Sequence, residues 1–413
     1  MSVEATNIKI KEIITIFKGK PPAVIPYYGK DALSYLSPEF LRGKELAVLA
    51  KPSSNGILVN DGDIVILWDG SNAGELFSAR RGLLASTMAL VEHSNNFDRQ
   101  YFFYGLKRWE SYLKGQTSGS GIPHVDKEVL GNLKILLLTR AEQTQIATIL
   151  STIDRAIEQT EALIAKQQRI KTGLMQDLLT KGIDENGNIR SEETHEFKDS
   201  PLGRIPVEWE VSQLRDTGTW LSGGTPSKSE KTYWGPFVPW VCSKDMKVFD
   251  LKNTLEMITQ KGVLSGSKVA PKDSVLIVVR GMILAHTFPV VYLTRDMAFN
   301  QDIKAIIPNE NIYGRYLAYW FSANSSQLLK LTTTATHGTK RLETNDLLEF
   351  ALCLPSKMEQ KKIIYLLDKS QYDIEITKEY LQKLKLQKTG LMQDLLTGKV
   401  RVTDLLNQKT ATN

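Results

Sequence analysis

The stretch KTGLMQDLLT occupies residues 171–180 and occurs a second time, unchanged, at residues 388–397. A chance match of ten consecutive residues is not credible. The correspondence continues without a gap toward the N-terminus of each copy, where Glu142-Gln143 matches Glu359-Gln360. It fades only upstream of Gly121 and its counterpart Gly338. A whole segment is therefore repeated, and the residues between the copies have diverged.

Both copies lie in segments with the periodicity of a long helix. From residue 139 to about 180 there is no proline, and apolar residues recur at alternating spacings of three and four. Residues 359–397 keep the same phase. This stripe is typical of helices that pair along their length, and at 1.5 Å per residue each would be about 55 to 60 Å long. The stripe residues are Leu150, Ile153, Ile157, Thr160, Ile164, Leu174 and Leu178 in the first copy, and Ile363, Leu367, Ile374, Leu381, Leu384, Leu391 and Leu395 in the second.

Helix pairing does not explain why the polar residues of the block are identical. Core positions tolerate exchange among Leu, Ile and Met, so packing alone would not hold Lys, Thr, Gly, Gln and Asp constant. A second surface that contacts the same residues twice would do so. The two glycines fit close approach of another helix, and equally the start of a helix end. The predicted partner-binding residues are Lys171, Gly173, Met175, Gln176, Lys388, Gly390, Met392 and Gln393.

The remainder of the chain indicates two mixed α/β domains. In each, β-rich runs are separated by turn signals and followed by a helical segment and a small-polar loop: KGQTSGSG at residues 114–121, and TTTATHGTK at residues 332–340. The predicted fold class is α+β, with two mixed domains separated by two long antiparallel helices in a coiled coil and an internal two-fold pseudo-symmetry. The expected boundaries are 1–138 for the first domain, 139–182 for the first helical region, 183–206 for a polar linker, 207–355 for the second domain, 356–400 for the second helical region and 401–413 for a C-terminal tail.

Composition places the chain among globular proteins with more than one domain. It has 413 residues, 42% of them hydrophobic, and a formal net charge of +6, which permits a nucleic-acid partner without requiring one. No run of 18 apolar residues suggests a membrane span, and the N-terminus lacks the apolar core of a secretory signal. Cys242 and Cys353 each lie among apolar residues, as buried thiols do in a reducing compartment. We expect a cytoplasmic protein without a membrane partner.

Sequence motifs for catalysis are missing. There is no Gly-x4-Gly-Lys-Ser/Thr loop and no Gly-x-Gly-x-x-Gly after a strand, and the five histidines are scattered singly without metal-ligand spacing. We expect no catalytic residues, no metal and no cofactor. The chain is interpreted as a binding protein.

Basic and hydroxyl-bearing loops are the remaining signal, since such side chains contact DNA phosphates and base edges. Each of these residues alone fits a solvated surface charge as well, and Trp234 also fits a core position. The predicted DNA-binding residues are Lys51, Ser53, Asn55, Arg80, Arg81, Lys107, Arg108, Lys114, Gln116, Thr117 and Ser118 in the first domain, and Lys228, Lys231, Trp234, Lys244, Lys247, Arg280, Thr333, Thr336, His337, Lys340 and Arg341 in the second.

Three features of the sequence resemble the specificity subunit of type I restriction-modification enzymes: two long helical segments that both end in KTGLMQDLLT, ILSTID at residues 149–154 in the first of them, and PLGRIPVEWEV at residues 201–211. The resemblance covers nearly the whole chain. It implies two target recognition domains, each reading one half of a split sequence in double-stranded DNA, and helices that set the spacer and bind two methyltransferase subunits. Motor-nuclease subunits would complete the restriction complex. Because Leu138 stands where the second copy has Pro355, we expect some difference at the start of the first helix.

Two rival functions remain on the residues alone. The chain could be a free-standing bipartite DNA-binding regulator, or a self-sufficient methyltransferase. The missing nucleotide and cofactor loops argue against the methyltransferase. Association with a methyltransferase subunit would separate the regulator from a specificity subunit.

Overall fold

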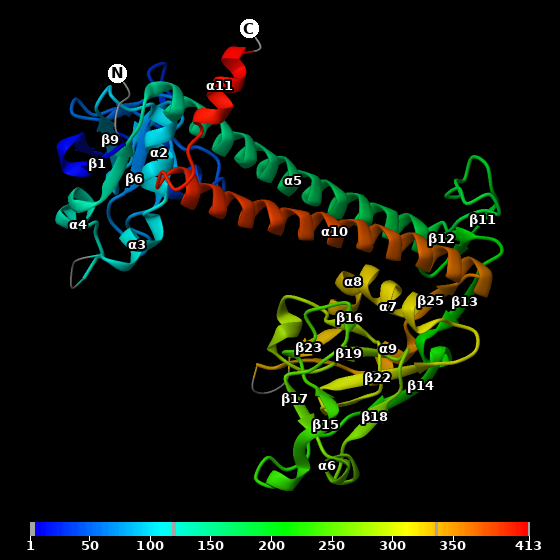
Figure 1. Ribbon diagram of the computed structural model, residues 1–413. Helices are drawn as coiled ribbons and strands as arrows, with labels where there is room; N and C mark the ends of the chain where they lie inside the picture. The colour runs from blue at the N-terminus through cyan, green and yellow to red at the C-terminus, as the bar shows by residue number, and fades with distance from the viewer. Residues whose placement is uncertain (1–4, 118–120, 335–337, 412–413) are drawn as a thin grey trace. The chain divides into compact units, whose positions relative to one another are not determined.

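The computed structural model describes residues 5–117, 121–334 and 338–411, which divide into two compact units (Figure 1). Unit 1 contains residues 1–162 and 378–413, and unit 2 contains residues 163–377. Each unit therefore holds one mixed domain together with part of each long helix. None of the helices in the described ranges combines the length and apolar character needed to cross a bilayer.

The domain of unit 1 consists of two four-stranded sheets and a short strand pair. One sheet has the order β2-β9-β6-β7 and is antiparallel, and the other has the order β4-β3-β8-β5 with β3 parallel to β8. Strand β1 pairs with β10, which leads into the first long helix. The elements are β1 (Thr6–Lys9), η1 (Ile10–Glu12), β2 (Ile14–Lys18), β3 (Leu33–Leu36), α1 (Pro38–Leu41), β4 (Leu49–Ala50), β5 (Leu58–Val59), β6 (Ile64–Leu67), β7 (Leu76–Ser78), β8 (Gly82–Leu84), β9 (Met88–His93), α2 (Arg99–Lys107), α3 (Glu110–Gly115), α4 (Lys127–Asn132) and β10 (Lys134–Leu137), and α11 (Thr403–Ala411) ends the chain.

The domain of unit 2 repeats this topology. Its sheets have the orders β14-β22-β19-β20-β16 and β17-β15-β21-β18, with β15 parallel to β21, and β13 pairs with β25. The additional strand β16 runs parallel to β20. The elements are β11 (Phe197–Ser200), β12 (Gly203–Pro206), β13 (Glu210–Gln213), η2 (Leu214–Thr217), β14 (Gly218–Ser222), η3 (Lys231–Tyr233), β15 (Trp234–Val241), β16 (Asp250–Leu251), β17 (Glu256–Ile258), α6 (Gln260–Leu264), β18 (Lys268–Ala270), β19 (Val275–Val278), η4 (Met282–Ala285), β20 (Val290–Leu293), β21 (Met297–Phe299), β22 (Ile303–Pro308), α7 (Gly314–Ala323), α8 (Ser325–Leu329), β23 (Thr332–Thr334), β24 (Lys340–Leu342), α9 (Thr344–Glu349) and β25 (Ala351–Leu354).

The long helices are α5 (Arg140–Thr180) and α10 (Lys357–Leu395). Both begin at a hydroxyl residue followed three positions later by a glutamate, and in both the hydroxyl accepts from the glutamate backbone N–H, at 3.3 Å for Glu142 and 3.2 Å for Glu359. This arrangement satisfies free donors of the first helical turn. Beyond each helix a glycine with positive φ turns the chain, Gly182 at 65° and Gly398 at 73°.

The two long helices pack antiparallel, as the sequence predicts. In unit 1 Lys388 pairs with Asp154 at 2.5 Å and Lys385 with Glu161 at 2.7 Å. In unit 2 Lys171 donates to the Gln371 side chain at 2.6 Å. Within unit 1, the residue numbers of the paired lysines on α10 fall as those of the acidic residues on α5 rise, so the two helices run in opposite directions. Most residues of the predicted stripes are buried, including Leu150, Ile153, Thr160, Ile164, Leu178, Ile363, Leu367, Ile374, Leu384 and Leu395.

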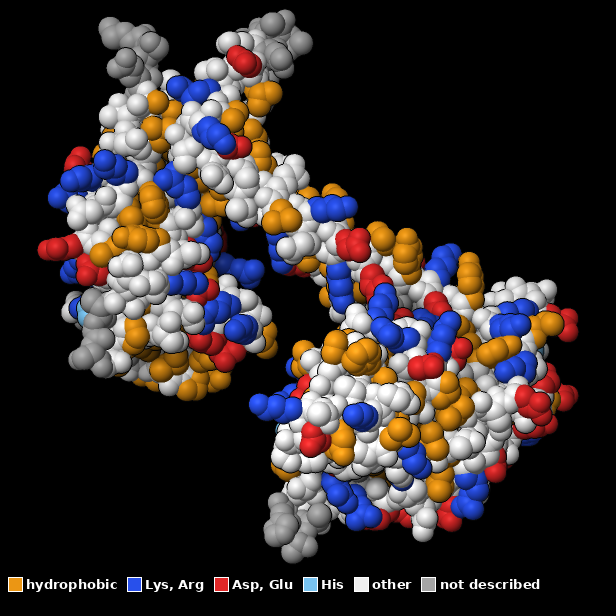
Figure 2. Space-filling model, turned by 60° about the horizontal axis from the view of Figure 1, so that its bottom comes forward, with side chains coloured by type: hydrophobic (Ala, Val, Ile, Leu, Met, Phe, Trp, Pro, Cys, Tyr) orange, Lys and Arg blue, Asp and Glu red, His pale blue; other side chains and the backbone are white. Residues whose placement is uncertain are grey.

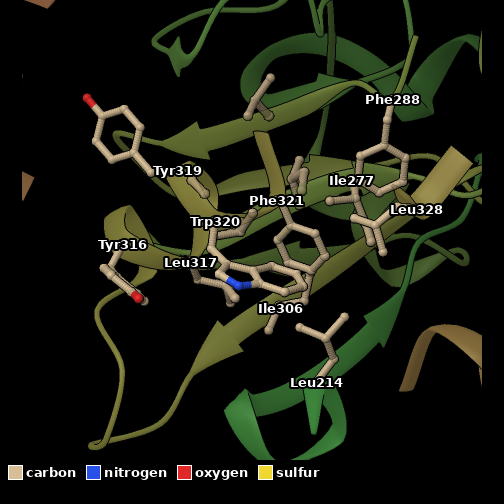
Figure 3. Close-up of a cluster of buried hydrophobic side chains, with 14 of the residues drawn as sticks. Leu214, Ile277, Phe288, Ile306, Tyr316, Leu317, Tyr319, Trp320, Phe321 and Leu328 are labelled. Atoms are coloured by element: carbon tan, nitrogen blue, oxygen red, sulfur yellow. The ribbon is translucent and has the colours of Figure 1, made fainter. Parts of the chain in front are cut away.

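The domain cores are built from the sheets and the helices that follow them. In unit 2 the central strand β19 packs against α7, whose Trp320 and Phe321 lie at the middle of the cluster (Figure 3). Tyr319 of the same helix points its hydroxyl away from that cluster (Figure 3). In unit 1 the helical segment that follows β9 is divided into α2 and α3 at Arg108-Trp109, where Trp109 has φ −92° and ψ −2°.

Candidate nucleic-acid interface and repeated block

In each domain the late polar loop ends against the turn that follows the central strand. In unit 2 Arg280 and Arg341 face each other in an antiparallel bridge, and the Gly281 N–H donates to the Lys340 carbonyl at 3.0 Å. In unit 1 Asp69 and His124 form the equivalent bridge, and Gly70 donates to Pro123 at 2.8 Å. We call the residues at this bridge, Arg280 and Arg341 in unit 2 and Asp69 and His124 in unit 1, the candidate reading edge of each domain. The backbone contacts of this edge are the same in both domains.

The side chains of the two reading edges differ in charge. In unit 2 Arg280 and Arg341 are both exposed and adjacent, while Lys340 donates to the Thr334 hydroxyl at 2.8 Å. Burial raises the pKa of the nearby Asp302 carboxyl, and the positive charge of Arg280 opposes that rise. In unit 1 the position of Arg280 is taken by Asp69, which forms an ion pair with Lys18 at 2.7 Å. The two edges therefore present different chemistry to a ligand.

The other predicted residues of unit 2 gather partly around an aromatic pair. Lys228 lies over Trp234 at 4.9 Å and over Trp240 at 5.8 Å, and it pairs with Glu256 at 2.9 Å. Trp234 is half-buried and meets the buried Trp240 edge to face at 5.2 Å, so it serves the core as well as the surface. The residues that remain exposed to solvent are Lys231, Lys244, Lys247 and Thr333.

Some of the predicted residues in unit 1 already have internal partners. Lys107 donates to the Leu76 carbonyl at 2.8 Å and pairs with Glu110 at 2.6 Å, and Lys114 also pairs with Glu110. Arg108 donates to the Leu396 carbonyl at 3.1 Å. Lys51 lies over Tyr27, and Ser53 is half-buried. The exposed residues are Asn55, Arg80, Arg81, Gln116 and Thr117, whereas Ser118, Thr336 and His337 lie outside the described residues.

Surface charge by itself does not outline a binding face. On the side drawn in Figure 2, Lys and Arg side chains are interspersed with Asp and Glu over both units. No cluster of three or more His, Cys, Asp or Glu suited to a metal ion occurs in the portion of the chain that is described. The candidate interface therefore rests on loop geometry.

A buried glutamine fixes each domain to its long helix. Gln143 donates to the Asn96 and Leu138 carbonyls at 3.0 and 2.9 Å and accepts from the Asp98 N–H at 2.6 Å. Gln360 donates to the Asn311 and Pro355 carbonyls at 2.9 and 3.0 Å and accepts from the Tyr313 N–H at 2.9 Å. The expected difference between Leu138 and Pro355 does not appear in this contact, because both residues contribute only a carbonyl.

The neighbouring glutamate ties the start of one long helix to the segment beyond the end of the other. In unit 1 Glu142 binds Arg401 at 2.6 Å, and in unit 2 Glu359 binds Arg190 at 2.6 Å. Glu359 also accepts from the Trp209 indole at 3.2 Å and the Ile183 N–H at 2.9 Å. Sequence reasoning missed Arg190 and Arg401. The duplicated Glu-Gln pair was the available signal, because identical buried polar residues need identical partners.

The repeated block has an inner and an outer face. The Lys171 Nζ lies over the Tyr319 ring and the Lys388 Nζ over the Tyr104 ring, each 5.7 Å from the ring centre. Lys171 therefore points toward the domain of unit 2, and Lys388 toward the domain of unit 1. Burial lowers the pKa of Lys171. Met175 and Met392 are half-buried against the same cores. The outer face is exposed in both copies and consists of Thr172, Gly173, Gln176 and Thr180, and of Thr389, Gly390, Gln393 and Thr397.

Both glycines of the outer face lie in open space. A Cβ added at Gly173 or at Gly390 would meet no atom within 4 Å. The threonine hydroxyls on either side bond back to helix carbonyls, as Thr172 does to Gln168 at 3.0 Å and Thr389 to Lys385 at 3.0 Å. The chain itself therefore gives no packing reason for the two identical glycines.

Comparison with known proteins agrees with this architecture. A family model described as the type I restriction modification DNA specificity domain matches residues 2–167 and again residues 206–386. The MjaVIII type I restriction enzyme specificity subunit of Methanocaldococcus jannaschii is 33% identical, over 96% of this chain and 93% of its own. The EcoR124I/EcoR124II specificity subunit of Escherichia coli is 31% identical over 46% of this chain and 48% of its own.

Solved structures share the fold at low sequence identity. The type I restriction-modification S subunit from M. genitalium covers 95% of this chain and 96% of its own, with a TM-score of 0.56 and 16% identity. A chain from a structure of type I restriction-modification complex assembly covers 95% and 97%, with a TM-score of 0.58 and 16% identity. Specificity subunits recognise DNA sequence through two domains, catalyse no step, and have DNA and the restriction-modification complex as partners. The chain belongs to the family of type I restriction-modification DNA specificity subunits.

Proposed function

We propose that each domain reads one half of a split DNA sequence, that the paired helices set the unread spacer, and that the repeated blocks bind two methyltransferase subunits. The proposal rests on the observation that the reading edges of the two domains have the same backbone contacts but different side chains. Arg280 and Arg341 in unit 2 stand where Asp69 and His124 stand in unit 1. Domains that read different base sequences need different edge residues on a shared scaffold.

The proposed DNA contacts are the predicted residues that keep exposed side chains. In unit 2 the loop containing Lys340 and Arg341 lies beside Arg280, so three cationic side chains come from two segments. Such groups position a protein on phosphates, and arginine also reads guanine. Lys107 and Arg108 belong to the proposal with less support, because their hydrogen bonds within unit 1 already account for them.

The proposed docking face is the outer face of the repeated block. It is exposed and polar, identical in the two copies, and contains a glycine that permits close approach of a second helix. Two equal docking faces fit two copies of one partner. We further propose that motor-nuclease subunits join this complex for restriction, and that the protein acts in the cytoplasm, where the DNA lies.

Sequencing of methylated DNA tests the proposal directly. The chain and the methyltransferase of its system are produced together in a host without other modification, and the methylated positions are mapped. A split motif with a fixed gap is expected. A continuous motif would overturn the two-half-site assignment, and unmethylated DNA despite a stable complex would overturn the targeting role. Absence of any methyltransferase association would favour a free-standing regulator instead.

A further inference from the structure

The second domain contains a charged junction with the long helix α10. Arg315, at the start of α7, donates through Nη1 and Nη2 to the Asp250 carboxylate at 2.6 and 3.1 Å. Its Nε donates to both oxygens of Asp368 on α10 at 2.7 Å. One guanidinium therefore joins three elements: α7, the strand β16 and the long helix. Burial opposes the charge, but the two carboxylates outweigh burial and raise the pKa of Arg315.

Aromatic side chains surround this guanidinium. The rings of Tyr292 and Phe249 lie 5.1 and 5.5 Å from it, and Phe249 stacks on Tyr319 with 4.4 Å between ring centres. The Tyr319 hydroxyl donates to Asp368 at 2.6 Å. Only 22% of the Arg315 side chain is exposed, so the pair with each carboxylate is shielded from water. Shielded charge-assisted bonds of this kind fix geometry strongly.

The first domain has a simpler junction. The N–H of Asp98 and that of Tyr313 bond to equivalent glutamines, so Gln100 occupies the position of Arg315. The contact to the helices is made by Tyr104, whose hydroxyl donates to Asp154 at 2.7 Å, and Asp154 pairs with Lys388. In the described part of unit 1, no strand of the first sheet corresponds to β16. A bridge from domain edge to long helix is thus a property of the second domain.

The geometry points to Arg315 as a positioning residue that holds the Lys244 to Lys247 segment of the second domain at a fixed place on α10, and so sharpens the spacer length that the protein accepts. The segment leads within three residues into Asp250, the residue that Arg315 binds. This inference rests on the proposed function, since it requires a split target and a spacer. It assigns to one residue a role that the proposed function gives only to the helices.

The expected physical consequence is a change in spacing preference. Removing one base pair shifts a half-site by about 3.4 Å and rotates it by roughly a tenth of a turn. A domain held by Arg315 cannot follow this displacement without breaking the contact between the Arg315 Nε and the Asp368 carboxylate on α10. A domain without that bridge moves more easily on the helix, so it tolerates the altered spacer while its own base contacts stay unchanged.

The test uses the full chain in complex with its methyltransferase and a DNA library in which the two mapped half-sites are separated by the native gap, one base pair fewer or one more. The methylated fraction at each gap is read by sequencing. Variant Arg315→Gln, which introduces the side chain of the first domain, is compared with Arg315→Lys and with Asp368→Asn. Arg215→Gln is the matched control, because Arg215 has an exposed ion pair with Glu349 in the same unit.

We expect the preference of Arg315→Gln for the native gap to fall about tenfold, within the usual range for coupling between sites. Arg315→Lys should recover part of the preference, and Arg215→Gln should match the wild type. Asp368→Asn keeps the Asp250 contacts and the side-chain size, so it tests the same link where Arg315→Gln fails to fold. A wild-type preference retained by both Arg315→Gln and Asp368→Asn overturns the inference alone. A wild type that methylates all gaps equally overturns the proposed spacer function.

Discussion

The glutamine contacts that join each domain to its long helix are the same in the two units, whereas the reading edges differ. Gln143 and Gln360 make the same three hydrogen bonds, down to the carbonyl five residues before each. Arg280 and Asp69 occupy equivalent places and carry opposite charges. The two copies thus keep the same glutamine contact between domain and helix and differ in the side chains of the reading edge. Identity between copies marks a shared structural or binding demand, and divergence marks specificity.

The two glutamates reveal a difference inside the shared junction. Glu359 and Arg190 are both about 10% exposed, and Glu359 has two further donors. Glu142 is only 2% exposed and also accepts from the Thr139 hydroxyl and N–H, but its partner Arg401 is 38% exposed. The arginine of this ion pair is therefore more buried in unit 2 than in unit 1.

The largest effect is expected from Glu359→Ala. It leaves Arg190 and the Trp209 indole without their acceptor in a buried site, which should cost about 4 kcal/mol of the unfolding free energy of unit 2. Glu142→Ala should cost unit 1 only about 2 kcal/mol, because water reaches Arg401. Hydrogen exchange of the sheet amides, read separately for each unit, measures both. Glu161→Ala, which removes an exposed pair, is the control. Equal losses at both glutamates would contradict the difference in environment.

Docking is tested by Gly173→Leu and Gly390→Leu. A Cβ at either position meets no atom of the chain within 4 Å, and leucine favours a helix over glycine, so folding should be retained. Each substitution should weaken one methyltransferase contact by at least about a hundredfold, or roughly 2.7 kcal/mol. Native mass spectrometry should find one bound subunit for each single variant and none for the double variant. Gln159→Leu, at an exposed α5 position outside the block, is the control. Two subunits bound to the double variant would rule out this face.

The charge difference between the reading edges predicts unequal salt effects. Lys340→Ala and Arg341→Ala should each weaken DNA binding by about 1 kcal/mol and lower the slope of log K against log salt by about 1. On the first-domain edge, where Asp69 stands in the place of Arg280, His124→Ala should leave the slope unchanged. Binding titrations at several salt concentrations measure the slope. Lys198→Ala, on the linker hairpin, is the control. An unchanged slope for both second-domain variants would remove that loop from the interface.

The smallest effect concerns acid stability of unit 1. Burial opposes ionisation of Glu142, but Arg401 and Thr139 outweigh it and hold the pKa of the carboxyl below its usual value of 4.5. Because this pKa is lowered in the folded state, the stabilisation is present above about pH 4.5 and is lost as pH falls through the lowered value. Glu142→Gln should therefore flatten the decline of unit 1 stability below pH 4.5. Hydrogen exchange referenced to unit 2 measures it, and an equally steep decline would exclude Glu142 as a contributor.

The sequence by itself determined the long helices, their antiparallel pairing and the repeated domain layout. Those features follow from hydrophobic periodicity and from the identity of two segments, and both can be seen directly in the amino-acid sequence. The register of the repeat also identified Glu142-Gln143 and Glu359-Gln360 as equivalent, and the family resemblance rested on the repeated helical blocks and on PLGRIPVEWEV. The sequence predicted a helical segment after the strands of the first domain but not its division into α2 and α3 at Trp109, because no proline or glycine marks that position.

Only the tertiary structure decided what the repeated residues do. Lys171 and Lys388 have the same sequence context as Gly173 and Gly390, yet the lysines point to their own domain and the glycines face open space. Likewise Arg108 and Arg341 look alike in sequence, but one binds a helix-end carbonyl and the other lies exposed beside Arg280. Contacts between residues distant in the chain depend on how strands and helices assemble. No local pattern could have brought Arg315 between Asp250 and Asp368, or Arg190 to Glu359, before the fold did.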